Sequence, residues 1–111
     1  MNVLETLISA RVLILNPNNW TQHVMARDAE GYRKNAQDNY ACQFCSLGAI
    51  ARMGGVDFIS DGGEAVKGAV DALQSAMGMP VARFNDNHTH KEVMAAWDNA
   101  IESLEKKNER T

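Results

Sequence analysis

Hydrophobic positions recur with the period of an α-helix in four stretches of this chain, and polar or glycine-rich segments separate them. We therefore predict a mainly α fold: a single-domain bundle of about four helices around a buried central helix, with a small β-hairpin insertion. The predicted helices run from about residue 3 to 15, from 40 to 53, from 64 to 77 and from 89 to about 105.

Capping residues set the ends of three of these helices. Asn2 with Glu5 predicts a capping box at the first, and the segment 89–92 (Thr-His-Lys-Glu) predicts another at the last. Gly78 ends the third helix, which starts between Asp61 and Glu64, and the segment 81–84 reads as a short extended connector. We expect the tail 106–111 to fray.

The central helix, Tyr40 to Met53, is apolar or small around nearly its whole circumference, which is typical of an enclosed helix. Asp38 is its predicted cap. Because Cys42 and Cys45 both lie in this helix, we expect them to be core-filling thiols. Before it, two short strands, residues 24–27 and 32–34, are predicted to pair across a turn at residues 28–31.

Length and composition limit the classes of function. The chain has 111 residues, 45% of them hydrophobic and 23% charged, which is typical of one globular domain, residues 1–111, without a membrane span. A net charge of -3 without a basic stripe argues against nucleic-acid binding. The N-terminal residues show no secretion signal, so we expect a cytoplasmic protein with reduced cysteines and no cofactor.

The cysteines and histidines allow three kinds of chemistry. Cys42 and Cys45 with His88 and His90 are the residue types of a zinc site, and Cys-x-x-Cys is also a redox pattern. Alternatively, Cys45 is a nucleophile with His88 or His90 as base and Asn85 or Asp86 as orienting group. A thiol in the middle of a buried helix is usually inert, so our leading prediction assigns no catalytic and no metal-binding residue.

Polar residues near the loops form a second candidate set. Arg11 interrupts an apolar stripe and must either extend to the rim or pair with a buried carboxylate. We group it with four other polar residues as a network that holds loops against helices, and alternatively as contacts to a ligand or partner. The complete set is Arg11, Arg27, Asp28, Asn85 and Asp86.

Several short runs together resemble an uncharacterised domain family of bacteria and their phages. They are Trp20, Ala26-Arg27-Asp28-x-x-Gly31, Phe44-Cys45-Ser46-Leu47-Gly48-Ala49-Ile50, Phe84-Asn85-Asp86, Thr89-His90-x-Glu92-Val93 and Ala100-Ile101. The resemblance covers nearly the whole chain and includes Cys45 but not Cys42. It implies no activity, and it implies a small accessory protein of a phage or mobile element.

We expect a non-enzymatic protein-interaction module, a modulator or inhibitor of a host or defence protein. Loops on a rigid helical scaffold commonly carry recognition, so its predicted surface lies around residues 20–33 and 84–90. The predicted binding residues are Trp20, Arg27, Asp28, Asn85, Asp86 and His88. The alternative is an enzyme or ligand-binding domain built on Cys45 with Asn85, Asp86 and His88. A protein partner is expected, without nucleic acid or membrane, and the sequence leaves the oligomeric state open.

Overall fold

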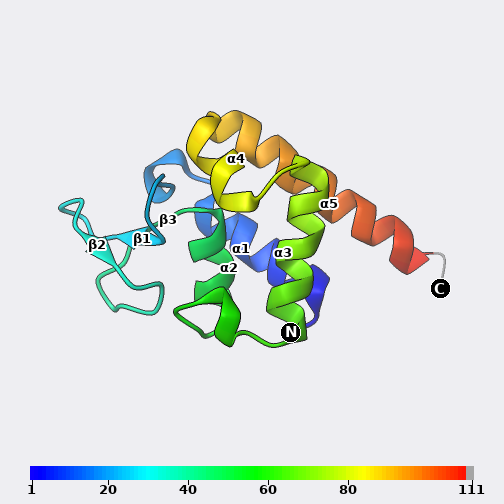
Figure 1. The fold of residues 1–111 in the computed structure, drawn as a ribbon, viewed down its shortest axis with the longest axis horizontal. Helices are drawn as coiled ribbons and strands as arrows, with labels where there is room; N and C mark the ends of the chain where they lie inside the picture. Colours follow the sequence, from blue (N-terminus) through cyan, green and yellow to red (C-terminus); the bar gives the residue numbers. More distant parts are fainter. Residues whose placement is uncertain (110–111) are drawn as a thin grey trace.

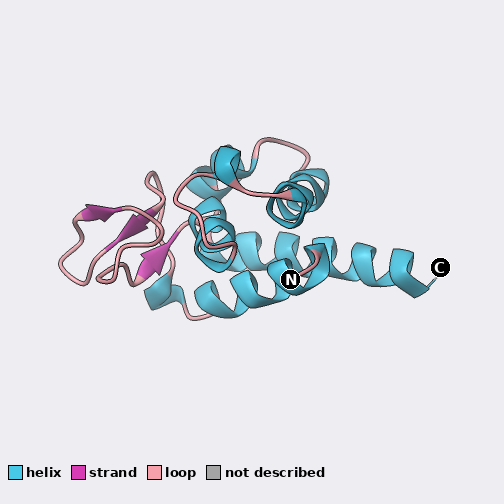
Figure 2. Ribbon diagram, turned by 90° about the horizontal axis from the view of Figure 1, so that it is seen from below, coloured by secondary structure: helices cyan, strands magenta, loops and turns pink. Residues whose placement is uncertain are grey.

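Two helices, α1 (Val3–Ile14) and α5 (His90–Glu109), lie side by side as one layer of the computed structural model, which describes residues 1–109 (Figures 1 and 2). Three further helices cover one side of this layer: α2 (Ser46–Met53), α3 (Glu64–Met77) and α4 (Val81–Asn87). Two 3-10 turns, η1 (Pro17–Asn19) and η2 (Ile59–Asp61), connect elements. The mainly α prediction is confirmed.

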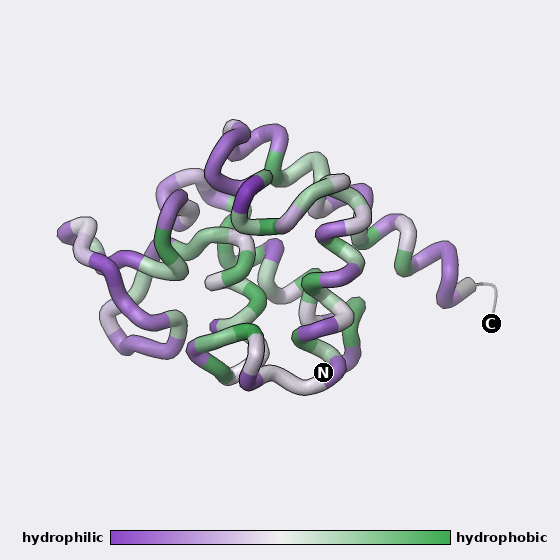
Figure 3. The backbone as a smooth tube through the Cα atoms, viewed as in Figure 1, coloured by the Kyte–Doolittle hydropathy of each residue, from purple (hydrophilic) through white to green (hydrophobic). Residues whose placement is uncertain are grey.

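A three-stranded antiparallel sheet projects from one end of the helices (Figure 1). Its strands are β1 (Ala26–Arg27), β2 (Arg33–Lys34) and β3 (Gln43–Phe44), in the order β2-β1-β3. Ala26 pairs with Lys34 on one side and with Phe44 on the other. The β1–β2 hairpin was predicted from the sequence and is confirmed. Figure 3 shows that the projecting end is largely hydrophilic.

Caps identified in the sequence form as predicted. The Asn2 side chain accepts a hydrogen bond from the Glu5 N–H at 2.8 Å, and the Glu5 carboxylate accepts one from the Asn2 N–H at 3.1 Å. Thr89 and Glu92 make the same reciprocal pair at 3.2 and 2.9 Å. Gly78 ends α3 in the left-handed region, with φ 70°. These helix boundaries are local properties of the chain.

The prediction for the central helix is wrong in its first half. The helix begins at Ser46, Cys45 is its N-cap, and residues 43–44 form strand β3. This segment pairs with β1: the Cys42 N–H donates to the Arg27 carbonyl at 2.9 Å and the Cys45 N–H donates to the Met25 carbonyl at 3.1 Å. Tyr40 and Cys42 are consequently exposed. Asp38 caps no helix, because its carboxylate accepts from the Tyr40 N–H in a turn.

The connector predicted at residues 81–84 is also wrong, because this segment opens α4. A seven-residue helix offers too few repeats for its apolar positions to show a period. Its buried face consists of Val81 and Asn85, and a buried asparagine does not read as hydrophobic in the sequence. The fold thus has a fifth helix, and Asn85 and Asp86 lie within it.

The core lies where α1, α2, α3 and α5 meet. Its largest fully buried apolar side chains are those of Leu7, Ile14, Phe44, Ile50, Leu73, Val93 and Trp97. Arg11 lies at the rim, where its Nε donates to Asp98 at 2.6 Å, so it extends outward and has no buried partner. Within residues 1–109, no helix is both long and apolar enough to cross a membrane.

We predict from the sequence that residues 106–111 fray; in the structure α5 continues to Glu109, so residues 106–109 are drawn as helix. The last part of this prediction, residues 110–111, lies outside the described residues.

Candidate functional site

Asn85 is buried where α4, the loop before β1 and the start of α2 meet. Its side-chain oxygen accepts three hydrogen bonds: from Trp20 Nε1 at 2.9 Å, from the Ser46 N–H at 3.0 Å and from the Ser46 hydroxyl at 2.8 Å. Its amide group donates to the Thr21 carbonyl at 3.0 Å. Ser46 in turn accepts from Trp97 Nε1 at 3.1 Å, so the bonds continue into the core. The Asn85 side chain therefore holds α4, the loop before β1 and the start of α2 together.

Gln22 and Arg27 extend these contacts across the loop before β1. The Gln22 amide donates to the carbonyls of Asn85 and His88, each at 3.1 Å. Arg27 donates to the Thr21 hydroxyl at 2.8 Å and to the Gln22 carbonyl at 3.2 Å. Among the described residues, no buried side-chain nitrogen or oxygen atom is left without a partner. The segment 20–27 is therefore held in place although it has little regular structure.

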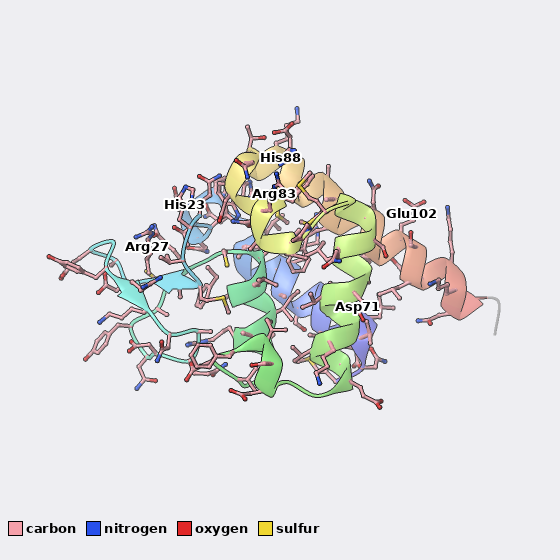
Figure 4. The ribbon with its side chains drawn as sticks, in the orientation of Figure 1. His23, Arg27, Asp71, Arg83, His88 and Glu102 are labelled. Carbon is pink, nitrogen blue, oxygen red and sulfur yellow. The ribbon has the colours of Figure 1, made fainter. Side chains whose placement is uncertain are left out.

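His23 is the one residue other than glycine with a left-handed backbone among residues 1–109, at φ 74°. Its N–H donates to Asp86 Oδ1 at 2.8 Å, and its ring nitrogen Nδ1 lies 3.8 Å from Asp86 Oδ2. Figure 4 shows His23 in the loop that leads to β1, next to α4. Strained backbone of this kind persists only where neighbouring contacts impose it, and here Asp86 supplies them.

A small pocket lies between this loop, the start of α2 and α4. It has a volume of about 170 Å³ and is lined by His23, Val24, Met25, Arg33, Cys45, Leu47, Ala82 and Asp86. We call it the Cys45 pocket. Cys45 is 5% exposed, and its sulfur accepts a hydrogen bond from the Gly48 N–H at 3.2 Å. The pocket thus combines a thiol, an imidazole and a carboxylate.

Burial raises the pKa of the Cys45 thiol above its ordinary value of 9.0, and the negative charge of Asp86 adds to the increase. Hydrogen bonds from the Gly48 and Leu47 N–H groups oppose it and do not reverse it. The thiol therefore stays protonated at neutral pH, and a protonated thiol is a poor nucleophile.

His88 does not meet Cys45, as the predicted catalytic alternative required. Its ring stacks on Phe84 with centroids 3.7 Å apart, and its Nδ1 lies 2.8 Å from the Phe84 carbonyl oxygen. His90 lies near Trp20, with its Nε2 2.8 Å from the Ile14 carbonyl oxygen. Trp20, His88 and His90 instead line a second, shallow depression.

The residues of the zinc alternative do not come together. Cys42 is exposed, Cys45 is buried, and both histidines contact backbone carbonyls. No group of three or more His, Cys, Asp or Glu side chains within residues 1–109 is placed to hold a metal ion.

The five-residue polar set is only partly assembled. Asn85 and Asp86 share one site, and Arg27 joins them through Thr21 and Gln22. Asp28 lies in the hairpin turn, where its carboxylate accepts from the N–H groups of Glu30 and Tyr32, each at 2.9 Å. Arg11 lies apart from the set and pairs with Asp98.

Sequence reasoning missed Ser46, Thr21 and His23 as members of the site. Ser46 follows Cys45 directly, but the predicted helix placed it in the middle of an apolar segment. His23 gives only a weak local signal for a left-handed backbone, because histidine adopts that conformation more often than most residues but much less readily than glycine. These residues acquire their positions only when α4 packs against the loop.

Comparison with known proteins adds one finding. No curated protein and no solved structure is significantly similar to this chain. One family model matches residues 1–103, and its description is a family of unknown function, DUF6197. This agrees with the resemblance to an uncharacterised domain family. The match covers most of the chain, so the protein belongs to the family of unknown function DUF6197.

Proposed function

We propose that this protein is a non-enzymatic protein-interaction module, whose contact surface is formed by residues 20–33 and 84–90 with the neighbouring residue Tyr40. In this proposal it acts in the cytoplasm as a modulator or inhibitor of a host or defence protein, on behalf of a phage or mobile element. The family resemblance supports this setting, and the exposed side chains and fixed loops described next support this surface.

Two exposed tyrosines at the sheet end carry the proposal. Tyr32 is 66% exposed and Tyr40 is 77% exposed. Tyr40 lines a hollow of about 250 Å³ together with the hairpin turn residues Asp28, Ala29 and Glu30. Tyrosine is enriched at the centres of protein interfaces, because it supplies a large contact area with few rotatable bonds.

Rigidity of the supporting loops favours the same surface. The hydrogen bonds from Asn85, Gln22 and Arg27 fix the segment 20–27 before any partner binds. A preorganised loop loses less conformational entropy on binding than a mobile one.

Capture of a partner from the lysate of a bacterial host tests this proposal. The tagged wild-type protein should retain one protein reproducibly and in stoichiometric amount, and the Tyr32→Ser/Tyr40→Ser variant should retain at least tenfold less. Asp71→Ala, on the exposed side of α3, is the matched control and should capture as much as the wild type. Failure to capture a stoichiometric partner, or equal capture by the double variant, would overturn the proposal.

The Cys45 pocket supports a second candidate, a site for a small ligand or a thiol reaction. The observation in its favour is that Cys45, His23 and Asp86 line one cavity. Alkylation by iodoacetamide in a Cys42→Ser background distinguishes the two candidates, because Cys45 is then the sole thiol.

The raised pKa of Cys45 and its burial predict slow alkylation at neutral pH, at least a hundredfold below that of free cysteine. The rate should increase with pH as the thiolate forms. Labelling at neutral pH as fast as that of free cysteine would favour the second candidate instead. The unfolded protein in urea is the control, and there Cys45 should react at the ordinary rate.

A further inference from the structure

The shallow depression lined by Trp20, His88 and His90 lies between the loop before β1, the end of α4 and the start of α5. Its volume is about 660 Å³. Sites for small molecules usually measure about 300–1,000 Å³, so its size is suitable for a ligand. We call it the Trp20 depression. Most of its other lining is polar and includes Gln22, Asp86 and Glu92.

Two of these polar side chains bind the protein through one atom and leave a second atom without a partner. Gln22 uses its amide nitrogen for two hydrogen bonds, to the carbonyls of Asn85 and His88. Glu92 accepts from Thr89 through Oε1. Within residues 1–109, Gln22 Oε1 and Glu92 Oε2 make no hydrogen bond. Both side chains are therefore fixed in position, and each offers a free acceptor.

The two histidines are held in the same way. His88 Nδ1 lies 2.8 Å from the Phe84 carbonyl oxygen, and His90 Nε2 lies 2.8 Å from the Ile14 carbonyl oxygen. Because a carbonyl oxygen can only accept, each of these nitrogens carries a proton. The second nitrogen of each neutral ring is then an acceptor, and neither has a partner among the described residues. The depression thus offers four free acceptors.

The charges around the depression also favour a donor. Asp86 and Glu92 each contribute a carboxylate, and none of the described residues that line the depression is a lysine or an arginine. The C-terminal end of α4 and the N-terminal end of α5 both adjoin it, so the partial charges of these two helix ends oppose each other. A cation is therefore favoured here, and phosphate and other anions are disfavoured.

A guanidinium group matches this set of acceptors better than other cations. It carries five N–H donors in one plane and no acceptor, so it can donate to several of the free atoms at once. Trp20 is partly exposed beside them, and tryptophan is the aromatic ring on which such a cation binds most favourably. A metal ion fits less well, because no group of three His, Cys, Asp or Glu side chains within residues 1–109 is placed to hold one.

We propose that the Trp20 depression binds a guanidinium group, which lies against the Trp20 ring and donates to Gln22, Glu92 and the two histidines. The group belongs to a free small molecule or to an arginine side chain of a protein partner, since both present the same donors. The site is separate from the contact made by Tyr32 and Tyr40, because neither tyrosine lines the depression.

Titration of the ¹⁵N-labelled protein with acetyl-Gly-Arg-Gly-amide, followed by NMR, tests the site. The chain has two tryptophans and hence two indole N–H signals, which Trp20→Phe assigns by removing one. The Trp20 signal should shift and saturate in the millimolar range, whereas the signal of the fully buried Trp97 should change little. The same peptide with citrulline in place of arginine has nearly the same shape and no charge. It should bind at least tenfold more weakly.

A matched pair of variants tests the contribution of the carboxylate. Glu92→Gln should weaken binding of the arginine peptide at least fivefold, because it removes the charge while a glutamine at this position still completes the capping box. Glu105→Gln removes the same charge from an exposed position of the same helix and should bind like the wild type. The comparison of the two peptides uses the wild type, so it remains decisive if Glu92→Gln folds poorly.

Methylguanidinium distinguishes the two sources of the group. Affinity equal to that of the arginine peptide would support a free small molecule, because the peptide backbone then adds nothing. Binding of the peptide at least tenfold more tightly would support an arginine of a protein partner. A Trp20 signal that neither probe shifts, equal binding of the arginine and citrulline peptides, or undiminished binding by Glu92→Gln would each refute the guanidinium site.

Discussion

The helical body and the sheet end, residues 20–45, are stabilised by different interactions. In the body, large side chains such as Leu7, Leu73 and Trp97 are fully buried against one another. In the sheet end, which the structure describes throughout, Phe44 is the one large hydrophobic side chain that is buried, and the other buried hydrophobic residues there are three alanines and Cys45. The sheet end therefore depends on directed hydrogen bonds, many of them made by side chains.

This difference makes the junction between the two regions important. Asn85 connects them through Trp20, Thr21 and Ser46, and Gln37 and Arg52 fasten the loop after β2 to the end of α2. Hydrogen bonds specify one geometry, whereas apolar packing mainly specifies burial. The sheet end is thus shaped by a few polar residues that are individually hard to replace.

The largest loss of stability is expected from a substitution in the helical body. Trp97→Ala should lower the free energy of unfolding by about 3–5 kcal/mol, because it leaves a cavity in the core and removes the donor to Ser46. Urea denaturation measures the change. Asn99→Ala, on the exposed side of the same helix, should stay within about 0.5 kcal/mol of the wild type. Similar losses for both variants would mean that the body is not packed around Trp97.

Asn85→Ala should disrupt the junction and lower the free energy of unfolding by about 3 kcal/mol. Three donors lose their shared acceptor, and the Thr21 carbonyl loses its donor. Amide hydrogen exchange should become faster throughout residues 20–27 and change little in α3. Asn87→Ala, two residues along on the exposed side of α4, is the control. Unchanged exchange in residues 20–27 would contradict the role given to Asn85.

Gly48→Ala should push the loop before β1 away from α2. An added Cβ would lie 1.9 Å from the Met25 carbonyl oxygen, so the backbone of one segment must move. We expect the free energy of unfolding to fall by about 1–3 kcal/mol, as it does when a core is overpacked. Gly63→Ala is the matched control, because a Cβ there meets nothing within 4 Å. Equal stability of the two variants would show that the loop is not held close to α2.

The smallest effect is pH-dependent and belongs to the start of α5. Hydrogen bonds from the Thr89 N–H and hydroxyl lower the pKa of Glu92 below its ordinary value of 4.5. Its contribution to stability is therefore present above about pH 4.5 and is lost as the pH falls through the lowered pKa. Thermal unfolding should show the wild type slightly above Glu92→Gln at neutral pH and level with it in acid. Glu105→Gln gives the background effect of removing an exposed carboxylate from the same helix.

Local signals in the sequence were sufficient for much of the fold. The capping boxes at Asn2 and Thr89, the stop at Gly78 and the hairpin turn at residues 28–31 all depend on residues within a few positions of one another. The candidate site was predictable only in part. Asn85 and Asp86 were identified, but their partners Ser46 and His23 were not, because 39 and 63 residues separate them from these partners.

By itself, the sequence determined the helical class, the hairpin and most helix ends, because hydrophobic period and capping act over one or two turns. Tertiary structure decided where the central segment stops being a strand and becomes a helix. Residues 40–45 are as suited to a helix as those that follow. They join the sheet instead, because the backbone groups along the second edge of β1 hydrogen-bond to them. Tertiary structure also brought Cys45, His23 and Asp86 together at one pocket. The sequence could not predict this, because contacts between distant segments produce no periodic pattern in the chain.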